Sequence, residues 1–124
     1  MGLRLARTTV DSHNITFRDN IVYYDDYRWV EMGRDTAGNW LGDLPTLDYN
    51  LYYYDTTTNV ITWNGTNHYA TLAAFVSATS QETHGAQSDP LFVDAANGDF
   101  HLQAGSPALT MSSTGSYVGA LPQG

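Results

Sequence analysis

The sequence predicts an all-β fold in which short strands recur along the chain, with one short α-helix docked against them. In the last third, apolar stretches only a few residues long are bounded by Asp-Pro, Gly-Asp and Ser-Pro turn formers. Such stretches are too short for helices and are typical of strands joined by turns. Residues 17–24 and 47–54 also align without gaps at an offset of thirty residues. Self-similarity at that period indicates stacked repeats.

The repeat predicts where the first strands lie and what joins them. Apolar and polar residues alternate over Ile15–Phe17 and again over Ile21–Tyr24, with Asn20 at the bend, and Asn50 holds the equivalent place before Leu51–Tyr54. Asn tolerates the backbone of a bend and can bond its neighbours, so Asn20 and Asn50 are expected to stack as a ladder of buried amides. Asp89-Pro-Leu-Phe is a candidate third copy.

The other segments are assigned by pattern. Residues 25–46 are polar and acidic and predict a long excursion, with one short strand around Tyr27–Met32. Residues 55–69 predict a hairpin around Asn64-Gly65. A helix is expected over 71–78, with Thr71 as its N-cap and Leu72, Phe75 and Val76 on its apolar face. Leu91–Val93 and Phe100–Leu102 complete the predicted strands.

Composition predicts one domain, residues 1–124, and removes several function classes. The formal net charge of −8 comes from 13 acidic and 5 basic residues, so the surface repels phosphate backbones and nucleic acid is not an expected partner. There is no cysteine, which excludes disulfides and thiolate metal sites. No segment approaches the ~20 apolar residues of a membrane span, and no signal peptide is recognisable.

Aromatic residues are the most prominent chemical feature, with 9 Tyr, 4 Phe and 3 Trp. Strand alternation predicts that Tyr53 faces the core while Tyr52 and Tyr54 face outward, and that Tyr24 stacks with Tyr54 across neighbouring repeats. Exposed aromatic rows bind the faces of sugar rings, although the same rows also stabilise parallel sheets, and we favour the stabilising role. The carbohydrate-binding candidates are Tyr24, Trp29, Trp40, Tyr52 and Tyr54.

Titratable residues offer weaker catalytic candidates. Paired carboxylates can act as general acid and base or bind calcium, but most Asp residues here stand at turn positions. Glu82 and His84 form a tempting acid–base pair, yet a hydrogen bond that fixes the turn is the favoured role for His84. His13, His84 and His101 are scattered singly, so no metal site is expected.

The last third resembles the C-terminal end of right-handed parallel β-helix proteins of the pectate-lyase-like superfamily. The resemblance rests on the His84, Asp89-Pro-Leu-Phe92, Gly98-Asp-Phe-His-Leu102 and Gly105-Ser-Pro-Ala108 elements, and on Asp48-Tyr-Asn-Leu-Tyr-Tyr53 upstream. It implies a short right-handed parallel β-helix, a single-stranded solenoid of about three to four coils. The matched run closes the solenoid, whereas chemistry in such enzymes usually sits on middle coils.

Many polysaccharide lyases of that fold use Arg or Lys as the base, helped by calcium carboxylates. This chain has no lysine, and Arg28 and Arg34 lie in the excursion. The resemblance therefore implies calcium as a conceivable cofactor and a set of weak catalytic candidates: Arg28, Arg34, Asp25, Asp26 and Glu31. Surface ion pairing is the favoured alternative for these residues.

Two function classes follow from these observations. The first is a non-catalytic β-helix module, either structural or weakly carbohydrate-binding. The second is a polysaccharide lyase or glycoside hydrolase with a site in the 25–46 excursion or at a subunit interface. Because a bare solenoid end leaves strand edges unpaired, and Leu3–Val10 is typical of a strand, a homodimer or higher oligomer joined through the N-terminal coil is expected. Secretion to an extracellular or periplasmic compartment would fit a β-helix origin.

Overall fold

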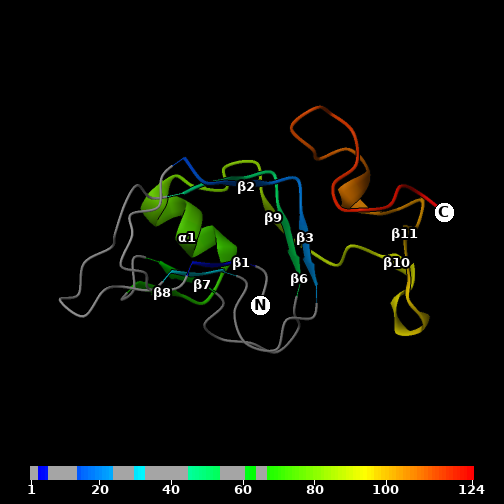
Figure 1. Cartoon of the computed structure of the whole chain (residues 1–124), viewed down its shortest axis with the longest axis horizontal. Helices are drawn as coiled ribbons and strands as arrows, with labels where there is room; N and C mark the ends of the chain where they lie inside the picture. Colours follow the sequence, from blue (N-terminus) through cyan, green and yellow to red (C-terminus); the bar gives the residue numbers. More distant parts are fainter. Residues whose placement is uncertain (1–2, 6–13, 24–29, 33–44, 54–60, 64–66) are drawn as a thin grey trace.

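The computed structural model describes residues 3–5, 14–23, 30–32, 45–53, 61–63 and 67–124. Within them the chain is mostly short strands with a single short α-helix, so the predicted all-β class is confirmed (Figure 1). The strands are β1 (Leu3–Leu5), β2 (Thr16–Arg18), β3 (Ile21–Tyr23), β4 (Val30–Met32), β5 (Thr46–Asp48), β6 (Leu51–Tyr53), β7 (Ile61–Trp63), β8 (Asn67–Tyr69), β9 (Ala86–Gln87), β10 (Phe92–Asp94) and β11 (Asp99–Leu102), and the helix is α1 (Leu72–Thr79).

The chain passes through three small sheets in the same order twice. Strands β2, β3 and β4 are followed by β5, β6 and β7, and each strand of the second set pairs in parallel with its counterpart in the first. Thr16 lies opposite Thr46 and Ile21 opposite Leu51, which is the thirty-residue register that the sequence repeat predicts. The predicted parallel pairing of these strands is confirmed.

The third copy of the repeat is not where the sequence suggested. Strand β9 pairs in parallel with β6, with Ala86 opposite Leu51, so Asp89-Pro-Leu-Phe follows the third copy instead of forming it. The insertion of β8 and α1 lengthens this turn of the chain, and a fixed offset therefore misses it.

The prediction that Leu91–Val93 and Phe100–Leu102 lie in parallel sheets is wrong. Strands β10 and β11 form an antiparallel hairpin, closed by a 3₁₀ turn at Ala95–Asn97. Gly98 ends that turn at φ 83°, a left-handed backbone that glycine adopts without strain. The hairpin is possible because only a few residues separate the two strands, whereas a parallel pair needs a long crossover.

Strand β6 is buried on both faces. Tyr52 is 0% exposed and packs in a core with Val22, Trp63 and Phe75, which α1 covers. Leu51, also 0% exposed, lies in a second core with side chains of the C-terminal segment, residues 88–124: Leu102, Ala108 and Val118. The predicted outward orientation of Tyr52 is therefore wrong. Tyr53 is half-buried and stacks on Tyr23, with ring centroids 5.8 Å apart.

The helix is as predicted. Thr71 is the N-cap, and its side chain accepts a hydrogen bond from the backbone N–H of Ala74. Leu72 and Phe75 are buried, and Phe75 packs edge-on against Trp63 at 5.1 Å. Ser80 ends the helix in a left-handed conformation. Since two helical turns are not stable alone, this docking holds the helix.

The hairpin expected around Asn64-Gly65 is present as the antiparallel pair β7–β8. Strand β4 falls inside the segment predicted as Tyr27–Met32, and β1 pairs with it in parallel at the edge of a four-stranded sheet. Most of the 25–46 excursion lies outside the described residues. Among the described residues, no helix is long and apolar enough to cross a membrane.

Candidate functional site

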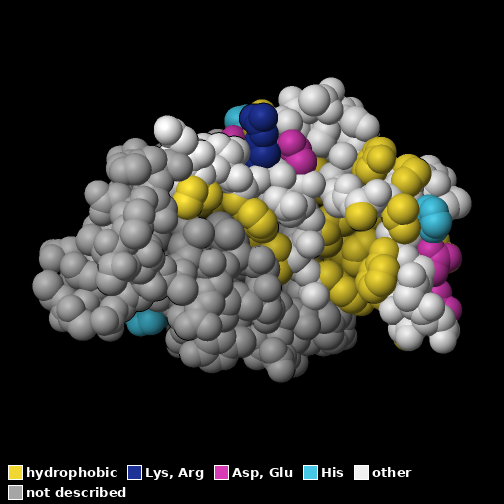
Figure 2. All heavy atoms as spheres, in the orientation of Figure 1, with side chains coloured by type: hydrophobic (Ala, Val, Ile, Leu, Met, Phe, Trp, Pro, Cys, Tyr) yellow, Lys and Arg dark blue, Asp and Glu magenta, His cyan; other side chains and the backbone are white. Residues whose placement is uncertain are grey.

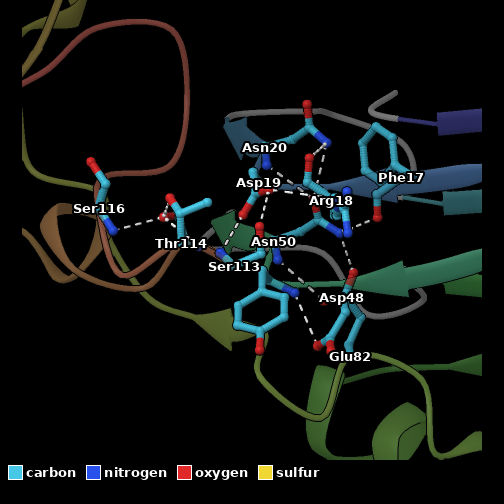
Figure 3. A network of polar contacts seen from close by, with 12 residues as sticks. Phe17, Arg18, Asp19, Asn20, Asp48, Asn50, Glu82, Ser113, Thr114 and Ser116 are labelled. Atoms are coloured by element: carbon cyan, nitrogen blue, oxygen red, sulfur yellow. Dashed lines mark hydrogen bonds and ion pairs between the residues drawn. The ribbon is translucent and has the colours of Figure 1, made fainter.

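A ladder of polar side chains joins three successive passes of the chain (Figure 3). The backbone N–H and Nδ2 of Asn20 both donate to Oδ1 of Asn50, each at 3.0 Å. Asn50 in turn donates from Nδ2 to the Phe17 carbonyl and to Oε1 of Glu82, and from its backbone N–H to Oε2 of Glu82. The predicted Asn20–Asn50 stack is confirmed, and Glu82 adds a third member to the ladder.

Glu82 is a buried carboxyl group, with its side chain 1% exposed. The Tyr52 hydroxyl donates to its Oε1 at 2.6 Å. Burial raises the pKa of Glu82, and this outweighs the hydrogen bonds from Tyr52 and Asn50, which act in the opposite direction. Burial and the negative charge of Glu82 also raise the pKa of Tyr52. The ladder therefore ends in a carboxyl group that is costly to ionise.

Glu82 and His84 do not form the tempting acid–base pair. His84 is bound instead by Asp48, which accepts from its backbone N–H and pairs with its Nδ1, both at 2.8 Å. Its ring stacks on Tyr49, with centroids 4.5 Å apart. Partial burial acts to raise the pKa of Asp48, but the hydrogen bonds from His84 and Tyr49 outweigh it and lower that pKa. The predicted turn-fixing hydrogen bond of His84 is confirmed.

The other histidine of the terminal motif has a similar partner. His101 pairs through Nδ1 with Asp99 at 2.7 Å, and Asp99 also accepts from the His101 backbone N–H. These bonds lower the pKa of Asp99. Both Asp–His pairs join groups at or near turns, and the Thr83 hydroxyl approaches His84 Nδ1 at 3.4 Å.

An aromatic cleft opens where β3 meets the β10–β11 hairpin. Its volume is about 320 Å³, and it is lined by Ile21, Tyr23, Phe92, Phe100, Gly119, Ala120 and Leu121. Phe92 stands edge-on to Tyr23 at 5.0 Å and to Phe100 at 5.2 Å. Figure 2 shows hydrophobic side chains gathered at the surface over this part of the chain, and Phe100 is 44% exposed.

The sequence-predicted site residues lie mostly outside the described part of the chain. This holds for Tyr24, Trp29, Trp40 and Tyr54 among the sugar-binding candidates, and for Asp25, Asp26, Arg28 and Arg34 among the catalytic ones. Glu31 lies in β4, in register with Arg4 of β1 and Thr62 of β7. Tyr52 is buried and offers no ring face to solvent.

The described residues contain no group of three or more His, Asp or Glu side chains that could hold a metal ion. The possible use of calcium stays a prediction, because most of the acidic residues of the excursion that motivate it lie outside the described residues.

Two parts of the site were not predicted from the sequence: Glu82 as a member of the ladder, and the Phe92–Phe100 pair as a wall of the cleft. The sequence does contain a signal for the Phe92–Phe100 pair, since these two residues flank the turn formers of residues 95–98. A hairpin across that turn places the two rings close together. For Glu82 the signal was weak, because the third copy is shifted by the inserted helix and carries no Asn.

Comparison with known proteins gives one match. A family profile described as "Domain of unknown function (DUF5123)" covers residues 3–116. The chain belongs to this family. The DUF5123 match includes the whole polar ladder, the two Asp–His pairs and the aromatic residues of the cleft, and it ends before Gly119–Leu121. No curated protein and no solved structure matches the chain.

Proposed function

We propose that the chain is a non-catalytic module of the right-handed parallel β-helix type, which ends a solenoid and binds carbohydrate weakly. The observation that carries the proposal is the repeated passage through the same three sheets in parallel register, with Thr16 opposite Thr46 and Ile21 opposite Leu51. Solenoids bury their core by stacking successive repeats on one another. The resemblance to pectate-lyase-like end coils supports the same interpretation.

The C-terminal segment supports a closing role. Its side chains Leu102, Ala108 and Val118 cover the outer face of β6. It also reaches back to the first bend of the chain, where the backbone N–H and hydroxyl of Ser113 donate to the Asp19 carboxylate, each at 2.7 Å. Gly119 donates its N–H to the Asp19 carbonyl. The last residues thus fasten a bend that lies ninety-four positions earlier in the chain.

The aromatic cleft supports weak carbohydrate binding. Tyr23, Phe92 and Phe100 provide ring faces and edges against which the apolar face of a pyranose can pack. The volume of about 320 Å³ lies at the lower end of the range for ligand pockets. Among the described residues that line the cleft there is no Asp, Glu, Lys or Arg, which favours a neutral sugar over a uronate.

A glycan array, run beside a lyase assay that follows unsaturated product with and without calcium, tests the proposal. We expect binding of neutral glycans and no turnover. Phe100→Ala should weaken that binding by about threefold to tenfold, since one aromatic contact contributes ~0.5–1.5 kcal/mol. Tyr117→Ala is the matched control, because Tyr117 is an exposed aromatic residue outside the cleft lining.

Two results would contradict the proposal. Equal binding by the Phe100→Ala and wild-type proteins would remove the cleft as the sugar site. Turnover that Arg28→Ala or Arg34→Ala abolishes would replace the module with an enzyme whose site lies in the 25–46 excursion.

A further inference from the structure

The three rings of the aromatic cleft form a corner and not a flat platform. The plane of the Phe92 ring stands at 84° to that of Tyr23 and at 87° to that of Phe100. A broad sugar face packs well on rings that share a plane, whereas rings that meet nearly at right angles enclose a compact space. The corner therefore suits a small apolar group that projects from a ligand.

The corner is accessible from solvent. Phe100 is 44% exposed and Leu121 is 37% exposed, and both line the cleft. Figure 2 shows hydrophobic side chains gathered at the surface over this part of the chain. A ligand group that covers these side chains removes apolar surface from water, which favours binding.

The lining offers little to a hydroxyl group. Among the described residues that line the cleft, Tyr23 alone has a polar side-chain group, which is its hydroxyl. A ligand hydroxyl that enters the corner loses its bonds to water, and the hydrocarbon side chains there do not replace them. Because a polar group buried without a partner is unfavourable, the corner favours a ligand group without a hydroxyl.

The rim of the cleft can bond the polar part of a ligand. Ala120 and Leu121 are exposed, and within the described part of the chain their backbone groups form no hydrogen bonds. The backbone groups beside them are occupied, since the Gly119 N–H donates to Asp19 and the Pro122 carbonyl accepts from the Leu102 N–H. A ligand with hydroxyl groups on one edge and a hydrocarbon group on another matches both the rim and the corner.

We propose that the aromatic cleft prefers a 6-deoxyhexose, a pyranose that carries a methyl group where an ordinary hexose carries a hydroxymethyl group. The methyl group lies in the corner against Phe92 and Phe100, and ring hydroxyls bond the backbone of Ala120 and Leu121. This preference depends on the proposed binding of neutral sugars at the cleft and names the class of sugar.

Two matched pairs of methyl glycosides, titrated into the protein and followed by NMR, test the preference. Methyl α-L-fucoside and methyl α-L-galactoside differ only by the hydroxyl group that the 6-deoxy sugar lacks, and so do methyl α-L-rhamnoside and methyl α-L-mannoside. In an enclosed hydrophobic pocket, one such group changes affinity by about tenfold to a hundredfold. In this open cleft we expect the 6-deoxy sugar of at least one pair to bind about fivefold more tightly or better. Saturation transfer from the protein should be strongest at its methyl group.

Two variants locate the methyl group. Phe100→Ala should remove the preference, so that both members of a pair bind with similar and weaker affinity. Tyr117→Ala should keep the preference, because Tyr117 is an exposed aromatic residue outside the cleft lining.

The outcomes separate this preference from the proposed function. Equal binding of both members in each pair, weakened by Phe100→Ala, would overturn the preference and leave the sugar site intact. A preference that Phe100→Ala retains in full would place the methyl group outside the corner and overturn it too. Binding by none of the four glycosides at millimolar concentration would also overturn it, and the glycan array then decides separately whether the cleft binds sugar.

Discussion

At the scale of single residues, Glu82 differs from the two Asn residues that precede it in the ladder. An amide carries both a donor and an acceptor, so Asn20 and Asn50 can pass hydrogen bonds from one repeat to the next without any charge. A carboxylate accepts from Asn50 and Tyr52 but brings a charge into a site that is 1% exposed. The third member of the ladder therefore makes the interior sensitive to pH.

Protein stability should fall as the pH rises through the raised pKa of Glu82. The native state holds a proton on Glu82 at pH values where the unfolded chain, with a pKa near 4.5, has released it. Between those two pKa values the native state binds more protons, so the free energy of unfolding decreases with rising pH. Chemical denaturation measured across this window checks the slope.

Glu82→Gln provides the comparison for that measurement, because it keeps an acceptor for Asn50 and removes the titration. We expect the variant to lose the downward slope above pH 4.5. Asp48 and Asp99 act in the opposite direction at lower pH, since their lowered pKa values contribute stability that is lost on acidification below 3.8. An unchanged slope in Glu82→Gln would show that Glu82 is already ionised throughout the window.

The sequence predicted the amide pair but not its continuation, for a physical reason. Asn20 and Asn50 occupy equivalent bends at a fixed offset, and that offset is visible in the sequence. In the third copy, Gly85 takes the backbone place of Asn50. Glu82 lies three residues earlier in the chain, and its side chain reaches the ladder from there. A side chain that joins the ladder from a non-equivalent position produces no repeat in the sequence.

At the scale of elements, the most consequential feature is that β6 is covered on both faces. One face packs under α1, and the C-terminal segment covers the other (Figure 1). The alternation of inward and outward side chains holds for a strand with one face exposed to solvent. It therefore predicted that Tyr52 points outward. Strands buried on both faces do not alternate, as parallel sheets commonly show.

Leu102→Ala should destabilise the protein by about 2–5 kcal/mol, because Leu102 is 0% exposed in the core between β6 and the C-terminal segment. Val93→Ala on the neighbouring strand β10 is the control. Val93 is 46% exposed, and its truncation should change stability far less. Denaturant melts of both variants provide the measurement. A Leu102→Ala protein as stable as wild type would mean that the C-terminal segment is not part of the cooperative fold.

Local chemistry made some elements predictable and others not. The N-cap at Thr71 and the apolar spacing of α1 are local features, and both predictions hold. The pairing of β10 with β11 depends on the direction in which the chain turns at Gly98, and apolar pattern alone does not encode direction. The resemblance to β-helix ends favoured parallel pairing there, whereas a short connection between strands favours a hairpin.

At the scale of the whole molecule, the two ends of the stacked strands differ. The later end is covered, since β8 folds back on β7 and residues 81–82 bond to the backbone of Leu47 in β5. At the earlier end, β1, β2 and β3 are the edge strands of their sheets in the described part of the chain. Proteins pair or cover such edges, which supports the association through the N-terminal coil that the sequence leads us to expect.

We therefore expect a homodimer, or a higher symmetric oligomer, when sedimentation or light scattering is measured at micromolar concentration. Thr16→Lys should shift it toward monomer, because Thr16 is exposed on the edge strand β2 and an edge lysine opposes pairing. Thr46→Lys places the same charge on the paired position of β5, whose outer edge residues 81–82 already cover, and should leave the oligomer intact. A wild-type monomer at that concentration, or equal dissociation by both variants, would refute pairing through the β2 edge.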